Sequence, residues 1–481
     1  MRLHLLVPLL LAACATAPVT PPRSPAPPPR PEVLRLQRPA GGEWLGLFLL
    51  GQKAGWLHAD TVEDSFEGRP AIRAEISLAL ELQVGGNVAR RTSVDRRWYE
   101  RREGGRLLGF EAIRRGDGGN RHVAGSCDEA RCAIAIADEG GVVHITVPLP
   151  PETADDADPV RLAAARRGTV AAVWLDLDEL EEKRASHRFD GEEGGLARVI
   201  TEEGGETFVT LLDEKGATRE VQLGPGLLAV AASEEEARAI GTPADVFALT
   251  SVPVPDPLPE APAAVVFEIE GLPERLWRED GRQRFEALGG GAVRVRIVAE
   301  PAATAAAEDD FALYKSFLRT SPSVDWDTPA VRALADAIRA EAASPRALAE
   351  ALVLHVHERL EKVYGASSDR ASRVLREGKG DCTEHALLFV ALARAAGLPA
   401  RQVHGLALAD GGAGRALYWH EWAEVHLEGG WVAVDPTFGQ FPADATHLAL
   451  GQERDAGATR VLGQLRIRKA TAPPVPAASF R

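Results

Sequence analysis

Three residues of types that can act together in nucleophilic catalysis follow one another in the chain: Cys382, His420 and Asp435. A cysteine attacks a carbonyl as its thiolate, so it needs a base and a setting that stabilises negative charge. A histidine can supply the base, and a carboxylate can orient the imidazole ring. The types and order of these residues predict a cysteine nucleophile that acts on carbonyl compounds.

Cys382 stands at the start of a predicted helix that runs to Ala396, directly after the turn-forming segment 378–381. Backbone amides at a helix N-terminus point toward a side chain placed there, which favours the thiolate and can also stabilise an oxyanion. Asp381 and Glu384 flank the cysteine. We expect both to be solvated or helix-terminal charges that complement the helix dipole.

His420 and Asp435 lie on two predicted strands, 417–427 and 430–435, which a short connection at Glu428-Gly429 joins as a hairpin. Pairing outward from this turn sets His420 opposite Thr437 and makes Asp435 its diagonal neighbour on the same face. The predicted hairpin therefore lets the carboxylate orient the imidazole.

Other interpretations of these residues stay open. Cys382 can be a buried inert thiol, or it can bind zinc together with His385, although one C-x-x-H pair supplies too few ligands. His385 follows Cys382 by nearly one helical turn, so we expect it to line the site and not to act as the base. His404 and His426 are expected to be packing or surface residues.

The N-terminus has the features of an export signal. Arg2 precedes an apolar stretch, 3–13, that is too short to span a bilayer, and the stretch ends in Leu11-Ala12-Ala13-Cys14, which resembles the bacterial lipobox. We expect residues 1–14 to be a lipoprotein signal, Cys14 to carry lipids, and the protein to be anchored at the outer membrane facing the periplasm. An ordinary signal peptide cleaved nearby is the alternative.

Two further cysteines, Cys127 and Cys132, lie between strand-like runs. An exported protein meets an oxidising compartment, so this close pair is predicted to form a disulfide. A metal pair is the alternative, but C-x4-C alone lacks ligands. Cys382 is then the unpaired thiol.

Composition and periodicity divide the chain of 481 residues into several parts. Short apolar runs with period two, such as Ile76, Leu78, Leu80 and Leu82, predict an antiparallel β-rich domain, whereas apolar residues spaced as in helices begin near residue 327. The predicted parts are the signal 1–14, a proline-rich linker 15–32, the β-rich domain 33–250, a connecting strand-rich segment 251–325, a catalytic domain 326–455 and a C-terminal tail 456–481.

The net charge of −15 argues against nucleic acid as the main partner, because phosphate binding needs clustered Lys and Arg. No loop of spaced Asp and Asn suggests calcium. We therefore expect no nucleic-acid partner, no cofactor and no metal.

Several ordered motifs resemble the bacterial transglutaminase-like superfamily: Gly380-Asp381-Cys382-Thr383-Glu384-His385-Ala386, then His420-Glu421-Trp422-Ala423-Glu424-Val425, then Val434-Asp435-Pro436-Thr437. The resemblance covers roughly residues 326 to 450. It implies an α+β class with a papain-like core of helices and a small antiparallel sheet, preceded here by the large β-rich domain. It also implies that Cys382 is the nucleophile, His420 the general base and acid, and Asp435 the orienting carboxylate. Tyr364 is a candidate to complete an oxyanion hole with the Cys382 amide.

The resulting expectation is a membrane-anchored cysteine enzyme that transfers acyl groups from peptide or amide bonds through a thioester. Hydrolysis is favoured over cross-linking, because water always competes and the sequence suggests no dedicated amine site. The alternative is a non-catalytic binding or assembly protein of the cell envelope that uses the same fold.

Overall fold

The computed structural model describes residues 32–36, 38–116, 119–138, 141–224, 226–300, 314–365, 368, 370–411, 414–427, 430–452, 461 and 463–473. Contacts divide the chain into two compact units. The first, here called the sheet unit, contains Arg2–Leu82 and Ala89–Ala244; the second, here called the layered unit, contains Gln83–Val88 and Asp245–Arg481. The predicted signal, Cys14 and residues 15–31 of the predicted linker lie outside the described residues. Within the described ranges, no helix is both long and apolar enough to cross a membrane.

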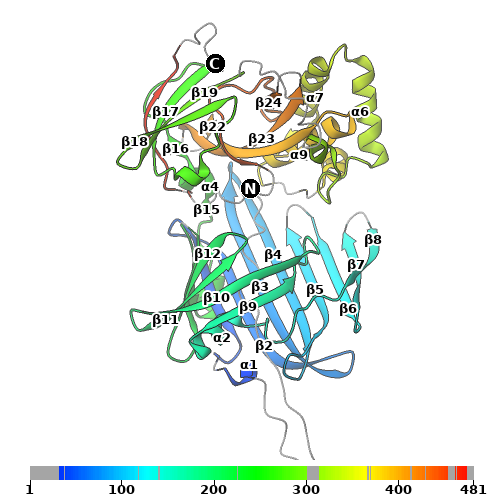
Figure 1. The fold of residues 1–481 in the computed structure, drawn as a ribbon, viewed down its shortest axis with the longest axis vertical. Helices are drawn as coiled ribbons and strands as arrows, with labels where there is room; N and C mark the ends of the chain where they lie inside the picture. The colour runs from blue at the N-terminus through cyan, green and yellow to red at the C-terminus, as the bar shows by residue number, and fades with distance from the viewer. Residues whose placement is uncertain are drawn as a thin grey trace, which may run out of the picture. The chain divides into compact units, whose positions relative to one another are not determined.

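The sheet unit is built on one large antiparallel sheet (Figure 1). Its strands follow the order β8-β7-β6-β5-β4-β3-β2-β1-β14-β13-β12-β11-β10-β9, so sequence neighbours pair almost throughout. The strands are β1 (Glu43–Leu49), β2 (Gln52–Phe66), β3 (Arg69–Val84), β4 (Asn87–Glu100), β5 (Leu107–Gly116), β6 (Arg121–Cys127), β7 (Arg131–Asp138), β8 (Gly141–Pro148), β9 (Thr169–Leu175), β10 (Glu182–Glu193), β11 (Leu196–Glu203), β12 (Glu206–Leu212), β13 (Thr218–Gly224) and β14 (Leu227–Ala232), with the short β15 (Ala244–Asp245) beside β3.

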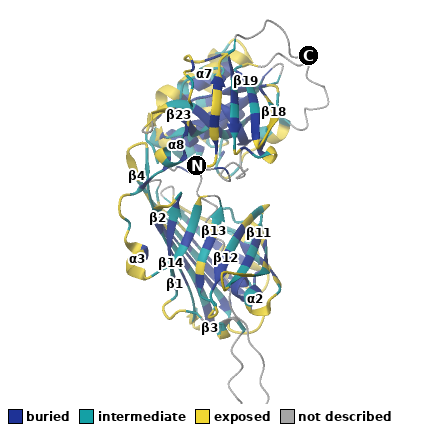
Figure 2. Cartoon of the chain, turned by 90° about the vertical axis from the view of Figure 1, so that its left-hand side faces the viewer, coloured by how far each residue is buried: buried dark blue, intermediate teal, exposed yellow. Residues whose placement is uncertain are grey.

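Alternating burial along these strands explains how the sheet forms its core (Figure 2). The apolar face predicted on β3 is buried at Ile76, Leu78 and Leu80, while Leu82 is only half-buried. One core contains residues from both ends of the strand order. It joins Phe110 of β5 with Leu175 of β9. The sheet must therefore curl so that its buried face meets itself.

Three short helices accompany the sheet: α1 (Glu32–Arg35), α2 (Pro159–Arg166) and α3 (Glu234–Arg238). A capping box begins α3, because the Ser233 hydroxyl accepts from the Glu236 amide while the Glu236 carboxylate accepts from the Ser233 amide.

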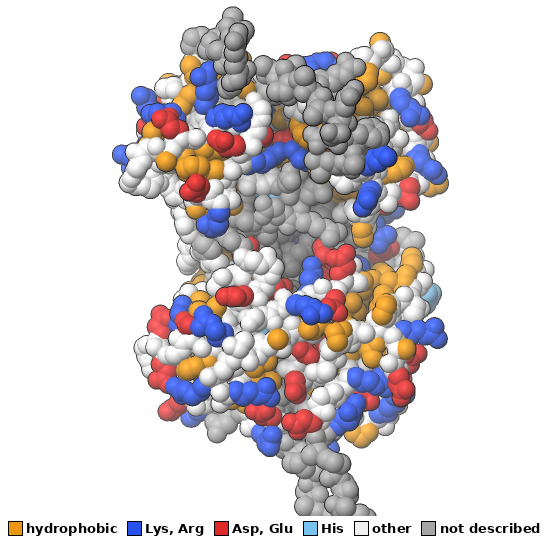
Figure 3. Space-filling view, in the orientation of Figure 1, with side chains coloured by type: hydrophobic (Ala, Val, Ile, Leu, Met, Phe, Trp, Pro, Cys, Tyr) orange, Lys and Arg blue, Asp and Glu red, His pale blue; other side chains and the backbone are white. Residues whose placement is uncertain are grey.

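Cys127 and Cys132 face each other across β6 and β7 and are joined by a disulfide with an S–S distance of 2.07 Å. The pair closes the tight connection between these two strands. On the face that Figure 3 shows, described Lys and Arg side chains lie among Asp and Glu side chains over both units.

The described part of the layered unit has two larger sheets, one two-stranded sheet and a group of helices. A five-stranded sheet has the order β16-β23-β22-β25, with β24 beside β23, and a four-stranded sheet has the order β18-β19-β17-β26. Its strands are β16 (Val252–Pro253), β17 (Ala264–Glu270), β18 (Gln283–Gly289), β19 (Ala292–Val298), β22 (Ala400–Gly411), β23 (Gly414–Leu427), β24 (Gly430–Val434), β25 (Leu448–Gln452), β26 (Arg466–Thr471) and the two-stranded pair β20 (Glu361–Lys362) and β21 (Lys379–Gly380). Its helices are α4 (Val246–Thr250), η2 (Glu274–Leu276), η4 (Lys315–Leu318), α6 (Pro329–Glu341), α7 (Pro345–Arg359), α8 (Ala371–Glu377) and α9 (Cys382–Ala395).

Two cores hold this unit together as three layers (Figure 1). One core packs the helices, including Leu388 and Phe389 of α9, against Val425 of β23 and Val434 of β24. The other packs the opposite face of the same sheet, through Leu417, against the four-stranded sheet. The five-stranded sheet is therefore covered on both faces, and α9 is buried along almost its whole length.

The α+β prediction for the chain is wrong, because strands make up 51% of the described residues and helices only 20%. A large antiparallel sheet forms the N-terminal part, and the long helices come from one stretch, 329–395. The helices with a small antiparallel sheet are present within the layered unit. The segment predicted as a C-terminal tail instead contributes β26, which pairs with β17 and completes the four-stranded sheet. Distant parts of the sequence meet there, and strand periodicity cannot reveal such pairing.

Candidate active site

Cys382 is the first residue of α9, and a capping box sets its position. The Asp381 carboxylate accepts a hydrogen bond from the Thr383 amide at 3.0 Å, and the Glu384 carboxylate accepts one from the Asp381 amide at 2.9 Å. These bonds satisfy backbone donors that the first helical turn leaves free. The sulfur is thereby held beside the positive end of the helix dipole.

Glu384 was expected to be a solvated or helix-terminal charge; it lies in the first turn of α9 but is buried, being 1% exposed. Burial, together with the nearby Asp381 carboxylate, raises the pKa of Glu384 well above its usual range. The Glu384 side chain also accepts from the Ser368 amide at 3.1 Å, so it ties the preceding loop to the helix. Gly380 packs against it so closely that an added Cβ would lie 2.3 Å from the Cβ of Glu384.

His420 lies on β23, and its Nε2 donates a hydrogen bond to Oδ2 of Asp435 at 2.7 Å. The two side chains are 7% and 0% exposed. Because Nε2 faces Asp435, Nδ1 is the ring nitrogen available to Cys382, which lines the same cavity as His420. The three residues are thus brought together in the order expected from the sequence.

The predicted hairpin register agrees with the observed one as far as the strands pair. β23 and β24 pair from Leu427↔Gly430 to Ala423↔Val434. The ladder then ends, and Asp435 forms an isolated bridge with Gln440. Asp435 therefore reaches His420 from the start of a turn, and not as a diagonal neighbour within a continuing ladder.

This turn fixes the Asp435 carboxylate. Its Oδ1 accepts from the backbone amides of Thr437 at 2.7 Å and Phe438 at 3.0 Å, so Oδ2 faces His420. The Phe438 ring lies parallel to the His420 ring, with centroids 4.6 Å apart. The imidazole is held on one edge by the carboxylate and on one face by the phenyl ring.

The electrostatics of the pair favour charged forms. Burial by itself would lower the pKa of His420, but the Asp435 carboxylate and the contact with Cys382 outweigh it and raise the pKa to about 9. Burial would raise the pKa of Asp435, but its histidine partners hold that pKa far below its usual range. This arrangement stabilises an imidazolium that can face a thiolate.

A second histidine on Asp435 was missed from the sequence. His447 is fully buried, and its Nε2 lies 2.9 Å from the same Oδ2 of Asp435 that His420 contacts. Its Nδ1 lies 3.2 Å from the carbonyl oxygen and 3.3 Å from Oδ1 of Asp444. The polar stretch Asp444-Ala-Thr-His447, close after Asp435, was the signal that could have indicated this residue.

His420, Asp435 and His447 are also the one group of three among the described residues whose ligand atoms lie close enough to hold a metal, within 4.8 Å of one another. Each of these atoms already makes a hydrogen bond with another member of the group. A metal would have to displace those bonds. Cys382 and His385, which the sequence offered as alternative zinc ligands, do not belong to this group.

The remaining histidines behave as packing residues. His385 is buried, and its Nδ1 donates to the Asp381 carbonyl at 2.7 Å, so it braces the start of α9. The His426 ring packs on Trp431 with centroids 5.3 Å apart. His404 lies against Gly451, where an added Cβ would come within 2.2 Å of its ring.

A cavity of about 320 Å³ opens beside Cys382 and His420. Aromatic rings form much of its wall, and Lys362 and Asp410 are charged residues at its lining. Tyr364, the oxyanion candidate, lines the same cavity as Cys382, and its ring packs edge-on against Phe247 at 5.2 Å. The aromatic residues of the wall are Phe247, Tyr364, Tyr418, Trp419 and Phe438.

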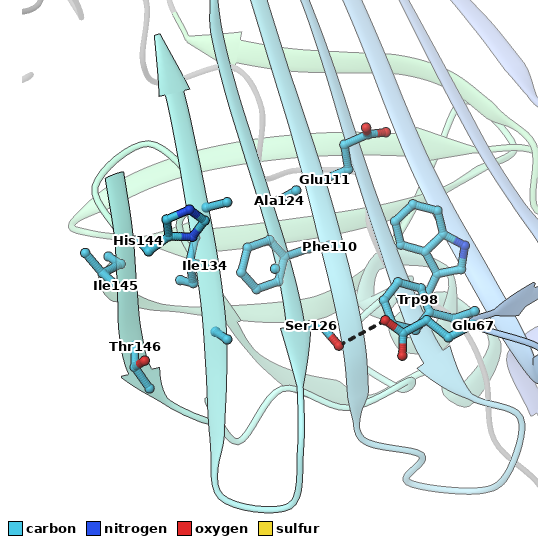
Figure 4. A pocket seen from close by; sticks show the side chains of 14 residues that line it. Glu67, Trp98, Phe110, Glu111, Ala124, Ser126, Ile134, His144, Ile145 and Thr146 are labelled. Carbon is cyan, nitrogen blue, oxygen red and sulfur yellow. Dashed lines mark hydrogen bonds between the residues drawn. The ribbon is translucent and has the colours of Figure 1, made fainter. Parts of the chain in front are cut away.

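The sheet unit has a hollow of its own, of about 660 Å³ (Figure 4). Phe66, Trp98 and Ile134 lie along it, and its carboxylates are engaged: Glu111 accepts from Arg96 and contacts His122, and Glu67 accepts from Ser126 at 3.4 Å. Its lining pairs no nucleophile with a base among the described residues. The pairing of a candidate nucleophile with a candidate base is therefore found in the layered unit.

Comparison with solved structures gives likenesses of low identity. A candidate cysteine protease from Cytophaga hutchinsonii is 16% identical, with a TM-score of 0.29 and coverage of 46% of this chain and 88% of that one. The periplasmic domain of TgpA from Pseudomonas aeruginosa is 20% identical, with a TM-score of 0.29. This match covers 40% of this chain and 89% of that one. A β-barrel-like protein of the domain of unknown function DUF1849 from Brucella abortus is 8% identical, with a TM-score of 0.27. This match covers 40% of this chain and 94% of that one.

No curated protein matches this chain. Residues 332–436 match the family described as the transglutaminase-like superfamily. This range begins in α6, includes Cys382 and His420, and ends directly after Asp435. The layered unit therefore contains a transglutaminase-like domain at residues 332–436.

Proposed function

We propose that this protein is a cysteine enzyme that hydrolyses peptide or amide bonds through a thioester on Cys382. The observation that carries the proposal is the buried hydrogen bond between His420 and Asp435 beside the half-buried Cys382 at the N-terminus of α9. A thiol with only a packing role needs neither a histidine partner nor a helix terminus. The cavity beside the sulfur gives a substrate access to it.

In the first step, the Cys382 thiolate attacks the carbonyl carbon, and the carbonyl oxygen becomes an oxyanion. The Cys382 amide and Tyr364 are the proposed donors to that oxygen. The carbon–nitrogen bond then breaks, and the His420 imidazolium gives its proton to the departing amine. The acyl group remains on sulfur as a thioester, and His420 is left neutral.

In the second step, a water molecule attacks the thioester while neutral His420 accepts one of its protons. The carbon–sulfur bond breaks, which restores the Cys382 thiolate and the His420 imidazolium. The product is a carboxylic acid. An amine in place of water would give transamidation, but water is present at high concentration in an open cavity and is the proposed acceptor.

The cavity wall supports a preference among substrates. Tyr364, Tyr418 and Phe438 offer apolar ring surface near the sulfur, so burying an aromatic or aliphatic group there is favourable by about 25 cal/mol per Å². We infer a peptide or protein substrate with such a group near the carbonyl that is attacked.

The site of action is proposed from the N-terminal sequence. Leu11-Ala12-Ala13-Cys14 resembles a lipobox, so the mature protein is proposed to be lipid-anchored at Cys14 in the cell envelope, at the outer membrane facing the periplasm.

A thioester trap tests the proposal. The wild-type protein, Cys382→Ala and Cys382→Ser are incubated with a mixture of cell-envelope peptides, quenched with acid and analysed by mass spectrometry. The expected result is an acyl adduct mapped to Cys382 in the wild type and cleaved peptides that Cys382→Ala does not produce. Equal cleavage by the wild type and Cys382→Ala would overturn the proposal.

A further inference from the structure

His447 is the group in this site that the proposed chemistry does not use, and its surroundings define its state. The Asp435 carboxylate receives four hydrogen bonds, from the amides of Thr437 and Phe438 and from the two histidines. A carboxylate in such a setting is ionised and can only accept. The Nε2 of His447, at 2.9 Å from Oδ2, must therefore carry a proton.

The other ring nitrogen of His447 also faces acceptors. Nδ1 lies 3.2 and 3.3 Å from two oxygens of Asp444. The Asp444 carboxylate itself accepts from the Thr446 amide at 2.8 Å and from Gln440 at 3.0 Å, so it too is an acceptor. A bare nitrogen there would set its lone pair against oxygen lone pairs. A proton on Nδ1 removes this repulsion, and a ring protonated on both nitrogens is an imidazolium.

We propose that His447 is a positioning residue, a buried imidazolium that holds Asp435 and sets the pH range over which His420 keeps its proton. The inference rests on the proposed function, because it concerns the base of that reaction. It makes the site a series of alternating charges: Cys382, His420, Asp435, His447 and Asp444. The raised pKa of His447, which its two carboxylate partners maintain against burial, agrees with this state.

The charged groups around His447 come from several elements. Asp435 follows β24, His420 lies on β23, and Asp444 belongs to the loop that leads into β25. Arg282, which precedes β18, donates to the Asp444 carbonyl. Two uncharged rings also lie near His447, Trp422 and Phe438, with ring centroids 5.2 and 5.9 Å from that of the imidazole.

A second positive ring near His420 has a calculable effect. The His420 and His447 centroids are 5.9 Å apart, and two unit charges at that distance repel enough to move a pKa by roughly 0.5 to 2 units for effective dielectric constants between about 80 and 20. His447 thus keeps His420 less basic than Asp435 alone would make it, so that His420 can give its proton to the departing amine in the first step.

The experiment compares the wild type with His447→Gln, which keeps a donor toward Asp435 but not the charge, and with His144→Gln, an exposed histidine on β8, as the matched control. The rate of Cys382 alkylation by iodoacetamide is measured from pH 5 to 11. The alkylation rate is expected to change at the pH at which His420 loses its proton. This pH is expected to rise by about one unit in His447→Gln and to be unchanged in His144→Gln. The same pH in His447→Gln as in the wild type would overturn the inference.

A second measurement keeps the inference falsifiable if His447→Gln does not fold. Nitrogen-15 NMR of the histidine rings in the wild-type protein reports whether both nitrogens of His447 are protonated. Two protonated nitrogens at pH 7 are expected, and a neutral ring would contradict the inference. Alkylation that does not depend on His420 would instead overturn the proposed function, and the NMR result would still decide the state of His447.

Discussion

Asp435 holds His420 through a hydrogen bond of 2.7 Å between two side chains that solvent scarcely reaches. Little water screens this contact, so the carboxylate acts on the imidazole at close to its full strength. The bond also selects which ring nitrogen is left for Cys382. One contact therefore determines both the orientation and the charge of the base.

Replacing Asp435 by Asn should remove the charge and keep the shape. We expect thioester formation on Cys382 to fall by about 10²- to 10⁴-fold, the range in which general acid–base catalysis usually contributes. Asp410→Asn is the matched control, because Asp410 lines the cavity but is largely exposed. The measurement is adduct formation by mass spectrometry, with circular dichroism to check folding. An Asp435→Asn protein as active as Asp410→Asn would contradict the role given to Asp435.

The stability of the layered unit should depend on pH through His420. Its pKa is raised from the ordinary 6.5 to about 9, so its stabilising effect is complete below about pH 6.5 and is lost as the pH rises toward 9. The lowered pKa of Asp435 acts in the opposite direction, since its contribution is present above the usual carboxyl range and is lost in acid.

Urea unfolding from pH 5 to 10 measures this dependence. The free energy of unfolding of the wild type should decline between pH 6.5 and 9, and His420→Gln should show a smaller decline. Other groups with raised pKa values, such as Glu384 and His447, contribute to both proteins, so the difference between them isolates His420. Equal slopes in the two proteins would rule out the raised pKa.

Gly380→Ala should disturb the start of α9. The new Cβ would meet the Cβ of Glu384 at 2.3 Å, which forces the capping box to move. We expect a loss of about 1 to 3 kcal/mol in the free energy of unfolding, together with slower alkylation of Cys382. Gly241→Ala, where an added Cβ meets nothing within 4 Å, is the control and should be neutral. A neutral Gly380→Ala would mean that the close contact does not hold the cap.

Removing metal should not change the reactivity of the thiol. The nitrogens and the carboxylate oxygen that join His420, Asp435 and His447 are used in hydrogen bonds to one another. Alkylation of Cys382 should therefore proceed at the same rate after dialysis against EDTA, with dialysis against buffer alone as the control. A rate that depends on added zinc would show that this group binds metal.

The sequence predicted the parts of the site that depend on local pattern. The turn-forming segment before Cys382 predicted the start of α9, and counting outward from a two-residue connection predicted the paired part of the β23–β24 hairpin. Helix caps and hairpin registers are decided by residues close in the chain. These short-range rules placed His420 and Asp435 on adjoining strands, but they did not predict the turn from which the Asp435 carboxylate reaches the imidazole.

The sequence could not predict features that arise from contacts between distant residues. His447 reaches Asp435 because the turn at Gln440 folds back, and no periodicity indicates that. The burial of Glu384 depends on Ser368 and on the close approach of Gly380. The pairing of β26 with β17 joins segments nearly two hundred residues apart, so a strand was taken for a tail.

The central claim, that Cys382 is an activated nucleophile, is tested most directly by the pH dependence of its alkylation with iodoacetamide, with peptide mapping to assign the label. The account predicts alkylation of Cys382 that is already rapid at acidic and neutral pH in the wild type and is slow there in His420→Ala. Alkylation that proceeds at the same rate in the wild type and His420→Ala at every pH would contradict the account.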